Sequence, residues 1–175
     1  MSSSKFDIVV YGATGFTGQL VAEYLATHYN GDANLKWAMA GRSKDKLASV
    51  RDAIGAPADI ALIVADAGDP VSLRAMVGQT KSVISTVGPY QRYGSELVAT
   101  CVAAGVDYLD LCGEPVWMRQ MIDAHEATAK STGARIVFLA VSIRFRSNSA
   151  SFPCRRKRRR FLEHRPAASR AGSAT

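Results

Sequence analysis

The chain has 175 residues, a length that suits one ordinary domain with its own core but not two large ones. Hydrophobic residues make up 47% and charged residues 21%, which are values of a globular protein. No run of about 18 apolar residues occurs, and the N-terminus lacks the apolar core of a secretion signal. These features exclude the membrane-spanning and secreted classes from the sequence-based expectation and favour a cytoplasmic protein.

The net charge of +7 is distributed unevenly. Through Ile143, 12 Lys and Arg stand against 14 Asp and Glu, a balance of −2. From Arg144 onward, 10 Lys and Arg stand against Glu163 alone, a balance of +9. The body of the chain is therefore slightly acidic, and its charge gives no indication of a specific nucleic-acid-binding domain.

Apolar runs alternate with helical patterns from the N-terminus onward. The expected strands cover residues 6–11, 35–40, 60–65, 82–87, 106–111 and 135–139. The expected helices cover residues 17–28, 44–54, 70–78, 95–104 and 115–131. This alternation predicts an α/β fold with a parallel sheet and right-handed crossovers, in residues 1–141.

The alternation of strand and helix patterns stops after about Val141. Residues 142–175 contain the basic run Arg155–Arg160, end in Ala, Ser, Arg and Gly, and show no periodicity. We expect this segment to be a disordered basic tail. Three cysteines at positions 101, 112 and 154 share no metal-ligand or redox spacing, so we expect no metal site.

A glycine motif follows the first expected strand and opens the first expected helix. It reads Gly12, Ala13, Thr14, Gly15, Phe16, Thr17, Gly18. Glycines at this point permit a tight turn, a close backbone approach to a pyrophosphate, and close packing of helix on strand. The phosphates of a dinucleotide would lie at the helix N-terminus, where free N–H groups and the helix dipole favour anions. The motif predicts a Rossmann-type doubly wound sheet of about six strands, and the alternative is a tight turn that binds nothing.

The end of the second expected strand favours NADP over NAD. An NAD-binding domain usually places a carboxylate there to bind the 2′-hydroxyl group. This chain has Arg42 and Ser43 instead, which could hold a 2′-phosphate. The alternative is that Ser43 is a helix N-cap beside a solvated arginine.

Two further segments end strands at the same edge of the expected sheet. Asp66 follows the third strand, where such folds often contact the adenine, although it could equally cap a turn or the next helix. The fourth strand ends in a segment that would border the nicotinamide half of the cofactor unless it is a purely structural turn. That segment consists of Thr86, Val87, Gly88, Pro89 and Tyr90.

Carboxylates end the fifth expected strand. Asp110 and Glu114 are candidate catalytic residues, because they could bind a substrate or relay a proton. They could equally cap the helix that begins at Pro115. No tyrosine has a lysine four residues later, so the Tyr-x-x-x-Lys pair of short-chain dehydrogenases is absent from the sequence.

With these residues in view, the chain resembles the saccharopine dehydrogenase-like oxidoreductases, and most of all their actinobacterial trans-acting enoyl reductases. The stretches that carry the resemblance are FDIVVYGATGFTG, AMAGRS, VADAGD, STVGPYQRYGSELVATCVAAGVDYLDLCGE and STGARIV. The resemblance implies NADP-dependent reduction of a carbon–carbon double bond in a lipid or polyketide intermediate. It also implies a further α/β domain at the substrate site, and association with a polyketide synthase or a membrane surface.

The end of the chain departs from this family. A GFDSIP-type motif follows the GARI stretch there, whereas this chain reads AVSIRFRSNS at residues 140–149. One allowed codon choice for that string, read in another frame, encodes G-F-D-S-I-P-F-E-L. Our hypothesis is a single-base frameshift near Phe138, which sequencing of the gene tests. We then expect a truncated reductase without its substrate domain. The alternatives are a non-catalytic dinucleotide-binding or regulatory module, and a non-specific nucleic-acid binder acting through the basic tail.

Overall fold

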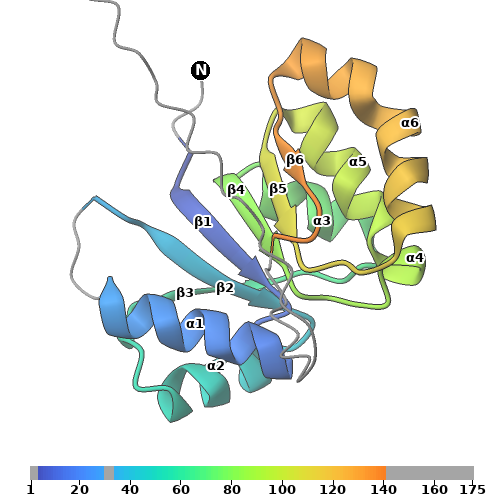
Figure 1. Ribbon diagram of the computed structural model, residues 1–175. Helices are drawn as coiled ribbons and strands as arrows, with labels where there is room; N and C mark the ends of the chain where they lie inside the picture. The colour runs from blue at the N-terminus through green and yellow to red at the C-terminus, as the bar shows by residue number, and fades with distance from the viewer. Residues whose placement is uncertain (1–3, 30–33, 141–175) are drawn as a thin grey trace, which may run out of the picture. The chain divides into compact units, whose positions relative to one another are not determined.

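A computed structural model describes residues 4–29 and 34–140 of the chain. Six parallel strands form one sheet in the order β3-β2-β1-β4-β5-β6, which confirms the predicted doubly wound fold (Figure 1). The strands are β1 (Phe6–Tyr11), β2 (Trp37–Gly41), β3 (Ala61–Val64), β4 (Thr80–Ser85), β5 (Asp107–Asp110) and β6 (Ile136–Val137). The helices are α1 (Phe16–His28), α2 (Lys44–Ala53), α3 (Pro70–Val77), α4 (Tyr90–Tyr93), α5 (Ser95–Ala104) and α6 (Pro115–Thr132).

Two apolar clusters hold the layers together, one on each face of the sheet. Val9, Tyr11, Val83 and Tyr108 face the layer of α3, α4, α5 and α6. Val10, Trp37 and Met39 face α1 and α2. The alternation of Val9 and Val10 between the two clusters is the period of two expected of a strand that is buried on both faces.

The predicted elements differ from the observed ones mainly at their ends. β4 begins and ends two residues earlier than the expected strand, because Thr80 pairs with Phe6 at the start of the ladder. The segment from Thr86 therefore lies beyond the strand. The short helix α4 was not predicted, since four residues are too few for a periodic pattern.

The start of α3 shows how side chains fix an element boundary. Asp69 is the N-cap and its carboxylate accepts a hydrogen bond from the Val71 N–H at 3.0 Å, with Pro70 in the first turn. At the other end of the chain, β6 is an edge strand of two residues, shorter than predicted. The predicted basic tail and the proposed frameshifted string from Val141 onward lie outside the described residues. Among the described residues, no helix is long and apolar enough to cross a membrane.

Candidate dinucleotide-binding site

The glycine loop lies in close contact with the residues after β4 and with α1. Gly12 has a φ of +88°, and a Cβ added there would lie 2.6 Å from Thr86 Oγ1 and 2.7 Å from Val87 Cγ2. A Cβ added to Gly18 would lie 2.1 Å from the carbonyl oxygen of Gly12. Since no real Cβ can approach so closely, Gly18 lets α1 pack directly on the loop. This is the packing role that the motif predicted for its last glycine.

The N-terminus of α1 is left open to an anion. Its N-cap is Gly15, which offers no side chain to the first turn, and the first turn contains no acidic residue. The first backbone N–H groups of a helix have no partner within the helix. A negatively charged group beside Gly15 would therefore be stabilised by these donors and by the helix dipole.

A cavity of about 260 Å³ lies over this loop at the carboxyl edge of the sheet. Its lining consists of Tyr11, Gly12, Thr14, Gly15, Gly41, Arg42, Asp66, Ala67, Thr86, Val87, Gly88 and Tyr93. These residues come from the ends of β1, β2, β3 and β4 and from α4, so the cavity straddles the point where the strand order reverses. Such switch points are where ligands bind in open α/β sheets.

Most of the predicted cofactor-binding residues meet in this cavity, and the others lie outside its lining. Ala13, Gly18 and Tyr90 are buried in the protein, and Phe16 is 83% exposed on the outside of α1. Ser43 is the N-cap of α2, because its hydroxyl accepts a hydrogen bond from the Lys46 N–H at 3.3 Å. Pro89 is the N-cap position of α4.

Arg42 and Asp66 enter the cavity from neighbouring strands. Arg42 follows the end of β2 and is exposed, so its guanidinium is available to a ligand. The carboxylate of Asp66 accepts a hydrogen bond from the Gly68 N–H at 2.8 Å, which holds the turn before α3. Asp66 therefore stabilises a turn and also lines the cavity. The two alternatives predicted for it, a ligand contact and a cap on a turn, are compatible.

Tyr11 lines the cavity. The sequence pattern indicates only that it is the last apolar residue of a buried strand. It is 2% exposed. Burial raises the pKa of the Tyr11 phenol to about 12; the carboxylate of Asp66 also raises it, and Arg42 lowers it. The phenol is therefore protonated at neutral pH and can donate a hydrogen bond.

The end of β4 is fastened to the glycine loop. The Thr86 hydroxyl lies 3.1 Å from the Tyr11 carbonyl oxygen and 3.2 Å from that of Gly12, and it donates to them. The Thr86 N–H also donates to the Tyr11 carbonyl at 2.9 Å. These bonds hold the residue after β4 against the end of β1.

Helix α4 brings Tyr93 rather than Tyr90 to the cavity. The Tyr90 hydroxyl donates to the Ser85 carbonyl at 3.2 Å, and its ring centroid lies 5.7 Å from that of Trp117 in the core. Tyr93, one turn later, lies at the cavity. Tyr93 is not among the residues predicted from the sequence, where the only signal for it is the second tyrosine in the PYQRY stretch.

Glu114 holds α4 in place. Its Oε1 accepts a hydrogen bond from the Tyr90 N–H at 2.8 Å, and its Oε2 accepts one from the Gln91 N–H at 2.9 Å. Both oxygens thus cap the N-terminus of α4, whereas the sequence suggested either a substrate contact or a cap on α6. The cap lies on the other helix because the β5–α6 loop passes beside α4.

Asp110 is buried beneath the same loop and does not line the cavity. It is 2% exposed and accepts hydrogen bonds from the Tyr108 hydroxyl at 2.9 Å and from the N–H groups of Cys112 and Leu139 at 3.0 Å each. Burial raises the pKa of this carboxyl group, and the two N–H donors and the phenol oppose that rise. Through these hydrogen bonds, Asp110 links the end of β5 to the residues that follow β6.

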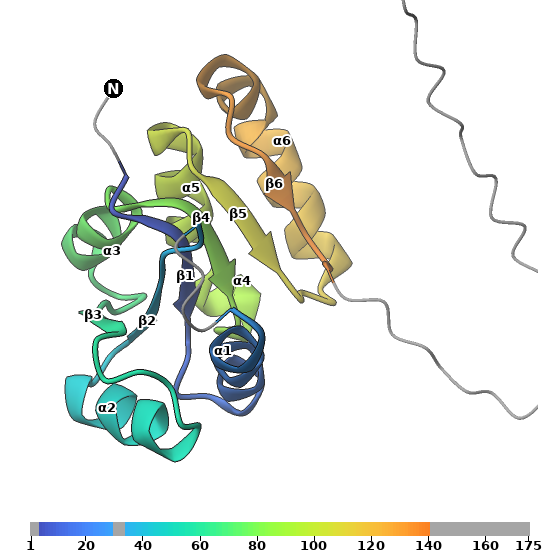
Figure 2. The same ribbon diagram turned by 90° about the vertical axis from the view of Figure 1, so that its left-hand side faces the viewer.

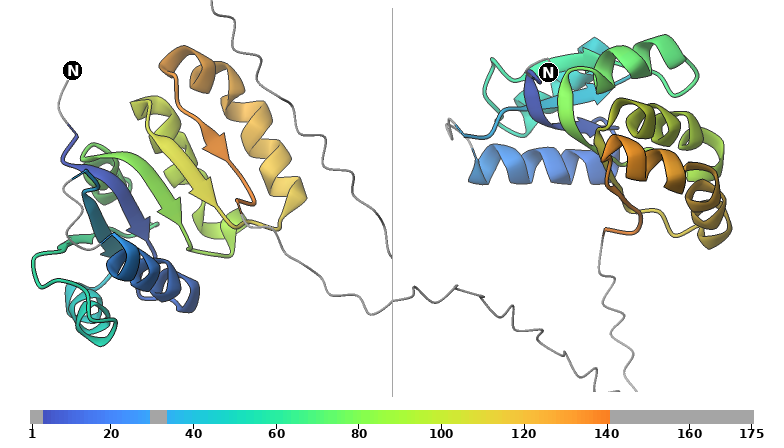
Figure 3. Two further views of the ribbon diagram at one scale, coloured as in Figure 1. Left: turned by 60° about the vertical axis from the view of Figure 1, so that its left-hand side comes forward. Right: turned by 90° about the horizontal axis from the view of Figure 1, so that it is seen from above.

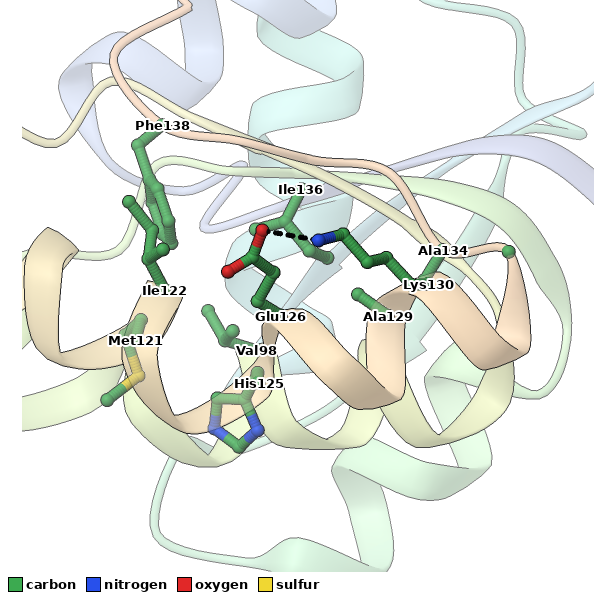
Figure 4. A pocket seen from close by; sticks show the side chains of 11 residues that line it. Val98, Met121, Ile122, His125, Glu126, Ala129, Lys130, Ala134, Ile136 and Phe138 are labelled. Atoms are coloured by element: carbon green, nitrogen blue, oxygen red, sulfur yellow. Dashed lines mark hydrogen bonds and ion pairs between the residues drawn. The ribbon is translucent and has the colours of Figure 1, made fainter.

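A second hollow, of about 380 Å³, lies between α5, α6 and β6 (Figure 4). Apolar side chains such as Met121, Ile122 and Phe138 line it, and the ion pair of Glu126 with Lys130 at 2.7 Å borders it. None of the predicted site residues lies there. We therefore place the candidate site at the smaller cavity, where the glycine loop and convergent polar groups are.

Comparisons with known proteins agree with this geometry. Residues 8–137 match the family model described as the saccharopine dehydrogenase NADP binding domain. A trans-acting enoyl reductase of Mycobacterium leprae is 51% identical over 134 residues, which are 76% of this chain and 31% of that protein. A Mycobacterium tuberculosis protein, provisionally named for the same activity, is 53% identical over 134 residues, with the same shares of the two chains. The chain thus spans less than a third of these relatives.

Solved structures show the same fold at low sequence identity. Saccharopine dehydrogenase of Saccharomyces cerevisiae superposes with a TM-score of 0.61 at 18% identity, over 77% of this chain and 27% of that one. A Citrobacter triphenylmethane reductase, solved with NADP(H), superposes with a TM-score of 0.54 at 21% identity, over 79% and 50% of the two chains. With the sequence match covering most of its length, the chain belongs to the saccharopine dehydrogenase NADP-binding domain family.

Proposed function

We propose that this chain is the cofactor-binding part of an oxidoreductase and that it prefers NADP(H) to NAD(H). The observation that carries the proposal is the cavity that the glycine loop and Arg42 both line. The two residues directly after β2 are Arg42 and Ser43, and neither is a carboxylate. A carboxylate there would repel a 2′-phosphate, whereas a guanidinium can bind it through two hydrogen bonds.

The lining residues fit the parts of such a cofactor. The open N-terminus of α1 at Gly15 would hold the pyrophosphate, and Gly12 lets the loop before it lie against Thr86 and Val87. Asp66 would border the adenine. Thr86 and Tyr93, on the β4 side, would border the nicotinamide. NADPH supplies a hydride when it is bound, and the residues named here bind and orient it.

The activity proposed for the intact protein is reduction of a carbon–carbon double bond in a lipid or polyketide intermediate. Support comes from relatives named for trans-acting enoyl reductase activity, which match this chain over 134 residues. Asp110 and Glu114 are proposed as residues that position the cavity wall rather than as groups that touch the substrate, since their oxygens accept hydrogen bonds from the protein. On the family resemblance, we also propose that the protein associates with a polyketide synthase or a membrane surface.

A second candidate is a dinucleotide-binding module without catalysis. The observation that favours it is that the carboxylates of Asp110 and Glu114 accept hydrogen bonds from the protein and that neither residue lines the cavity. Hydride transfer requires a positioned substrate and a site closed to water. The residues that line the cavity would then bind NADPH without turning over an enoyl substrate.

Titration of the protein with NADPH and NADH, followed by cofactor fluorescence, tests the proposal. We expect NADPH to bind at least about tenfold more tightly than NADH, a difference of about 1.4 kcal/mol. Failure of both cofactors to bind would contradict the proposed function. Tighter binding of NADH would contradict the role of Arg42. Turnover of an enoyl thioester by this chain would exclude the non-catalytic alternative.

A further inference from the structure

Three tyrosine side chains are buried in the described part of the protein, those of Tyr11, Tyr90 and Tyr108. The Tyr90 hydroxyl donates to the Ser85 carbonyl at 3.2 Å, and the Tyr108 hydroxyl donates to the Asp110 carboxylate at 2.9 Å. The Tyr11 hydroxyl has no hydrogen-bond partner among the described residues. Buried polar groups are nearly always hydrogen-bonded, so this exception requires an explanation.

The Tyr11 hydroxyl has access to open space. Within residues 4–29 and 34–140, no side-chain nitrogen or oxygen that is sealed from solvent lacks a partner. A hydroxyl group without a partner therefore keeps some contact with solvent. Tyr11 is only 2% exposed, and it lines the cavity of about 260 Å³ at the glycine loop. The hydroxyl is therefore open to this cavity.

The position of β1 brings Tyr11 to the middle of the cavity lining. β1 lies inside the sheet, with β2 on one side and β4 on the other (Figure 2, and the left view of Figure 3). Tyr11 is the last residue of β1. Arg42 lowers the pKa of its phenol and Asp66 raises it, so both charges lie near the phenol. The hydroxyl is therefore close to the part of the cavity that Arg42 and Asp66 line.

Neither charged neighbour accepts the hydroxyl proton. Oδ1 of Asp66 accepts a hydrogen bond from the Gly68 N–H at 2.8 Å. The Arg42 guanidinium has donors only. Because burial raises the pKa of Tyr11 to about 12, the phenol keeps its proton at neutral pH. The cavity thus contains an O–H donor that a bound ligand can supply with an acceptor.

With NADP(H) as the proposed cofactor, on which this step rests, we propose that the Tyr11 hydroxyl donates a hydrogen bond to the phosphorylated ribose of its adenosine half. Arg42 binds the 2′-phosphate and Asp66 borders the adenine, so the ribose that joins these two groups lies nearest to Tyr11. Hydroxyl and phosphate oxygens of this ribose are acceptors. Tyr11 is thus a cofactor-binding residue, and phenylalanine at this position would leave that acceptor without its donor.

Isothermal titration of Tyr11→Phe with NADPH and with adenosine 2′,5′-bisphosphate tests this contact. The variant removes only the hydroxyl, and it is expected to weaken the binding of both ligands at least about fivefold. Tyr24→Phe makes the same change on α1 at a side chain that is 55% exposed, and as the matched control it should leave both dissociation constants unchanged. A loss for NADPH but not NADH assigns the bond to the 2′-phosphate, and an equal loss for NADH assigns it to the ribose hydroxyls.

Urea denaturation distinguishes a ligand contact from a structural one. Tyr11→Phe breaks no bond among the described residues and should keep the wild-type midpoint. Tyr108→Phe, which removes the bond to Asp110, should lower it. A midpoint lowered as much in Tyr11→Phe would show that its hydroxyl is paired within the protein, and would overturn the proposed contact.

The titrations also separate this contact from the proposed function. Wild-type affinity of Tyr11→Phe for NADPH and the bisphosphate would overturn the contact and leave the proposed function standing. A loss for NADPH without one for the bisphosphate would place the hydroxyl at the nicotinamide half, against the proposal. Failure of the wild type to bind either NADPH or NADH would contradict the proposed function and the role of Tyr11 with it.

Discussion

The carboxyl ends of β2 and β3 and the carboxyl end of β5 meet one edge of the same sheet but use their polar residues in different ways. Beyond β2 and β3, Arg42 and Asp66 line a cavity, and Arg42 is exposed to a ligand. Beyond β5, both oxygens of Glu114 and both oxygens of Asp110 accept hydrogen bonds from the protein.

This difference separates a binding edge from a structural one. Charged residues at the carboxyl edge of a parallel sheet suggest function, yet here only those beyond β2 and β3 reach the cavity. The groups beyond β5 shape the cavity indirectly, through α4 and the loop that supports it. A variant on the first side should change ligand binding, and a variant on the second should change stability or the position of α4.

The largest expected effect is that of Gly18→Ala, which disturbs the packing of α1 on the glycine loop. The added methyl group would lie 2.1 Å from the Gly12 carbonyl oxygen and force α1 away from the loop. We expect a loss of about 3 kcal/mol in the free energy of unfolding, measured by urea denaturation. Gly113→Ala, where nothing lies within 4 Å of the added Cβ, is the control and should stay close to wild type. An unaltered midpoint for Gly18→Ala would show that the helix can shift at little cost.

Arg42→Ala should weaken NADPH binding and spare stability. Loss of a charge-assisted contact to the 2′-phosphate should cost about 2 kcal/mol, roughly 30-fold in the dissociation constant. NADH, which lacks that phosphate, should bind the variant and the wild type alike. Arg119→Ala, a distant exposed site on α6, controls for the change in net charge. An equal loss for both cofactors would assign Arg42 to another part of the ligand.

Glu114→Gln should affect binding only through α4. The amide retains one acceptor and turns donors toward a backbone N–H, so the cap on Tyr90 and Gln91 is weakened. We expect NADPH to bind about tenfold more weakly, or about 1.4 kcal/mol. Glu96→Gln, in the first turn of α5, is the matched control.

A double-mutant cycle with Tyr93→Ala distinguishes this role from general destabilisation. If Glu114 acts by placing Tyr93, the Glu114→Gln change should have no further effect on NADPH binding in the Tyr93→Ala background. Additive losses in the cycle would refute that linkage, and thermal denaturation would show how much of each loss is stability.

The smallest expected effects are changes in the free energy of unfolding with pH. The contributions of Asp110 and Asp107 should change with pH in opposite directions. Burial raises the pKa of Asp110, so the folded protein keeps this proton to a higher pH than the unfolded chain does. Its contribution to stability is therefore greatest below its ordinary pKa of 3.8 and is lost as the pH rises through the raised pKa. Hydrogen bonds with Arg135 lower the pKa of Asp107, whose contribution is present above 3.8 and lost as the pH falls.

Urea denaturation of Asp110→Asn and Asp107→Asn against wild type, from pH 3 to 7, measures the two slopes. The wild type should lose its advantage over Asp110→Asn as the pH rises, and gain one over Asp107→Asn. Slopes of the same sign would mean that the hydrogen bonds to Asp110 outweigh its burial and lower its pKa.

Much of the fold and part of the site could be predicted because the signals are local. The glycine motif, Pro70 and the apolar runs act within a few residues of themselves, and the structure confirms the strands and helices that they indicate. Tyr93 and the cap formed by Glu114 could not be predicted in this way. Each depends on α4 and the β5–α6 loop lying side by side, a contact between residues more than twenty positions apart.

The two cores on opposite faces of the sheet contain one tryptophan each. Trp37 is buried with Val10 and Met39 on the α1 side, and Trp117 is buried on the other side, where its indole N–H donates to the Ser95 hydroxyl at 2.9 Å. The chain has two tryptophans in all, so Trp37→Phe and Trp117→Phe each leave a single fluorophore in one layer. The emission of each variant reports the melting of its own layer, and coincident transitions would show that the two layers unfold as one cooperative unit.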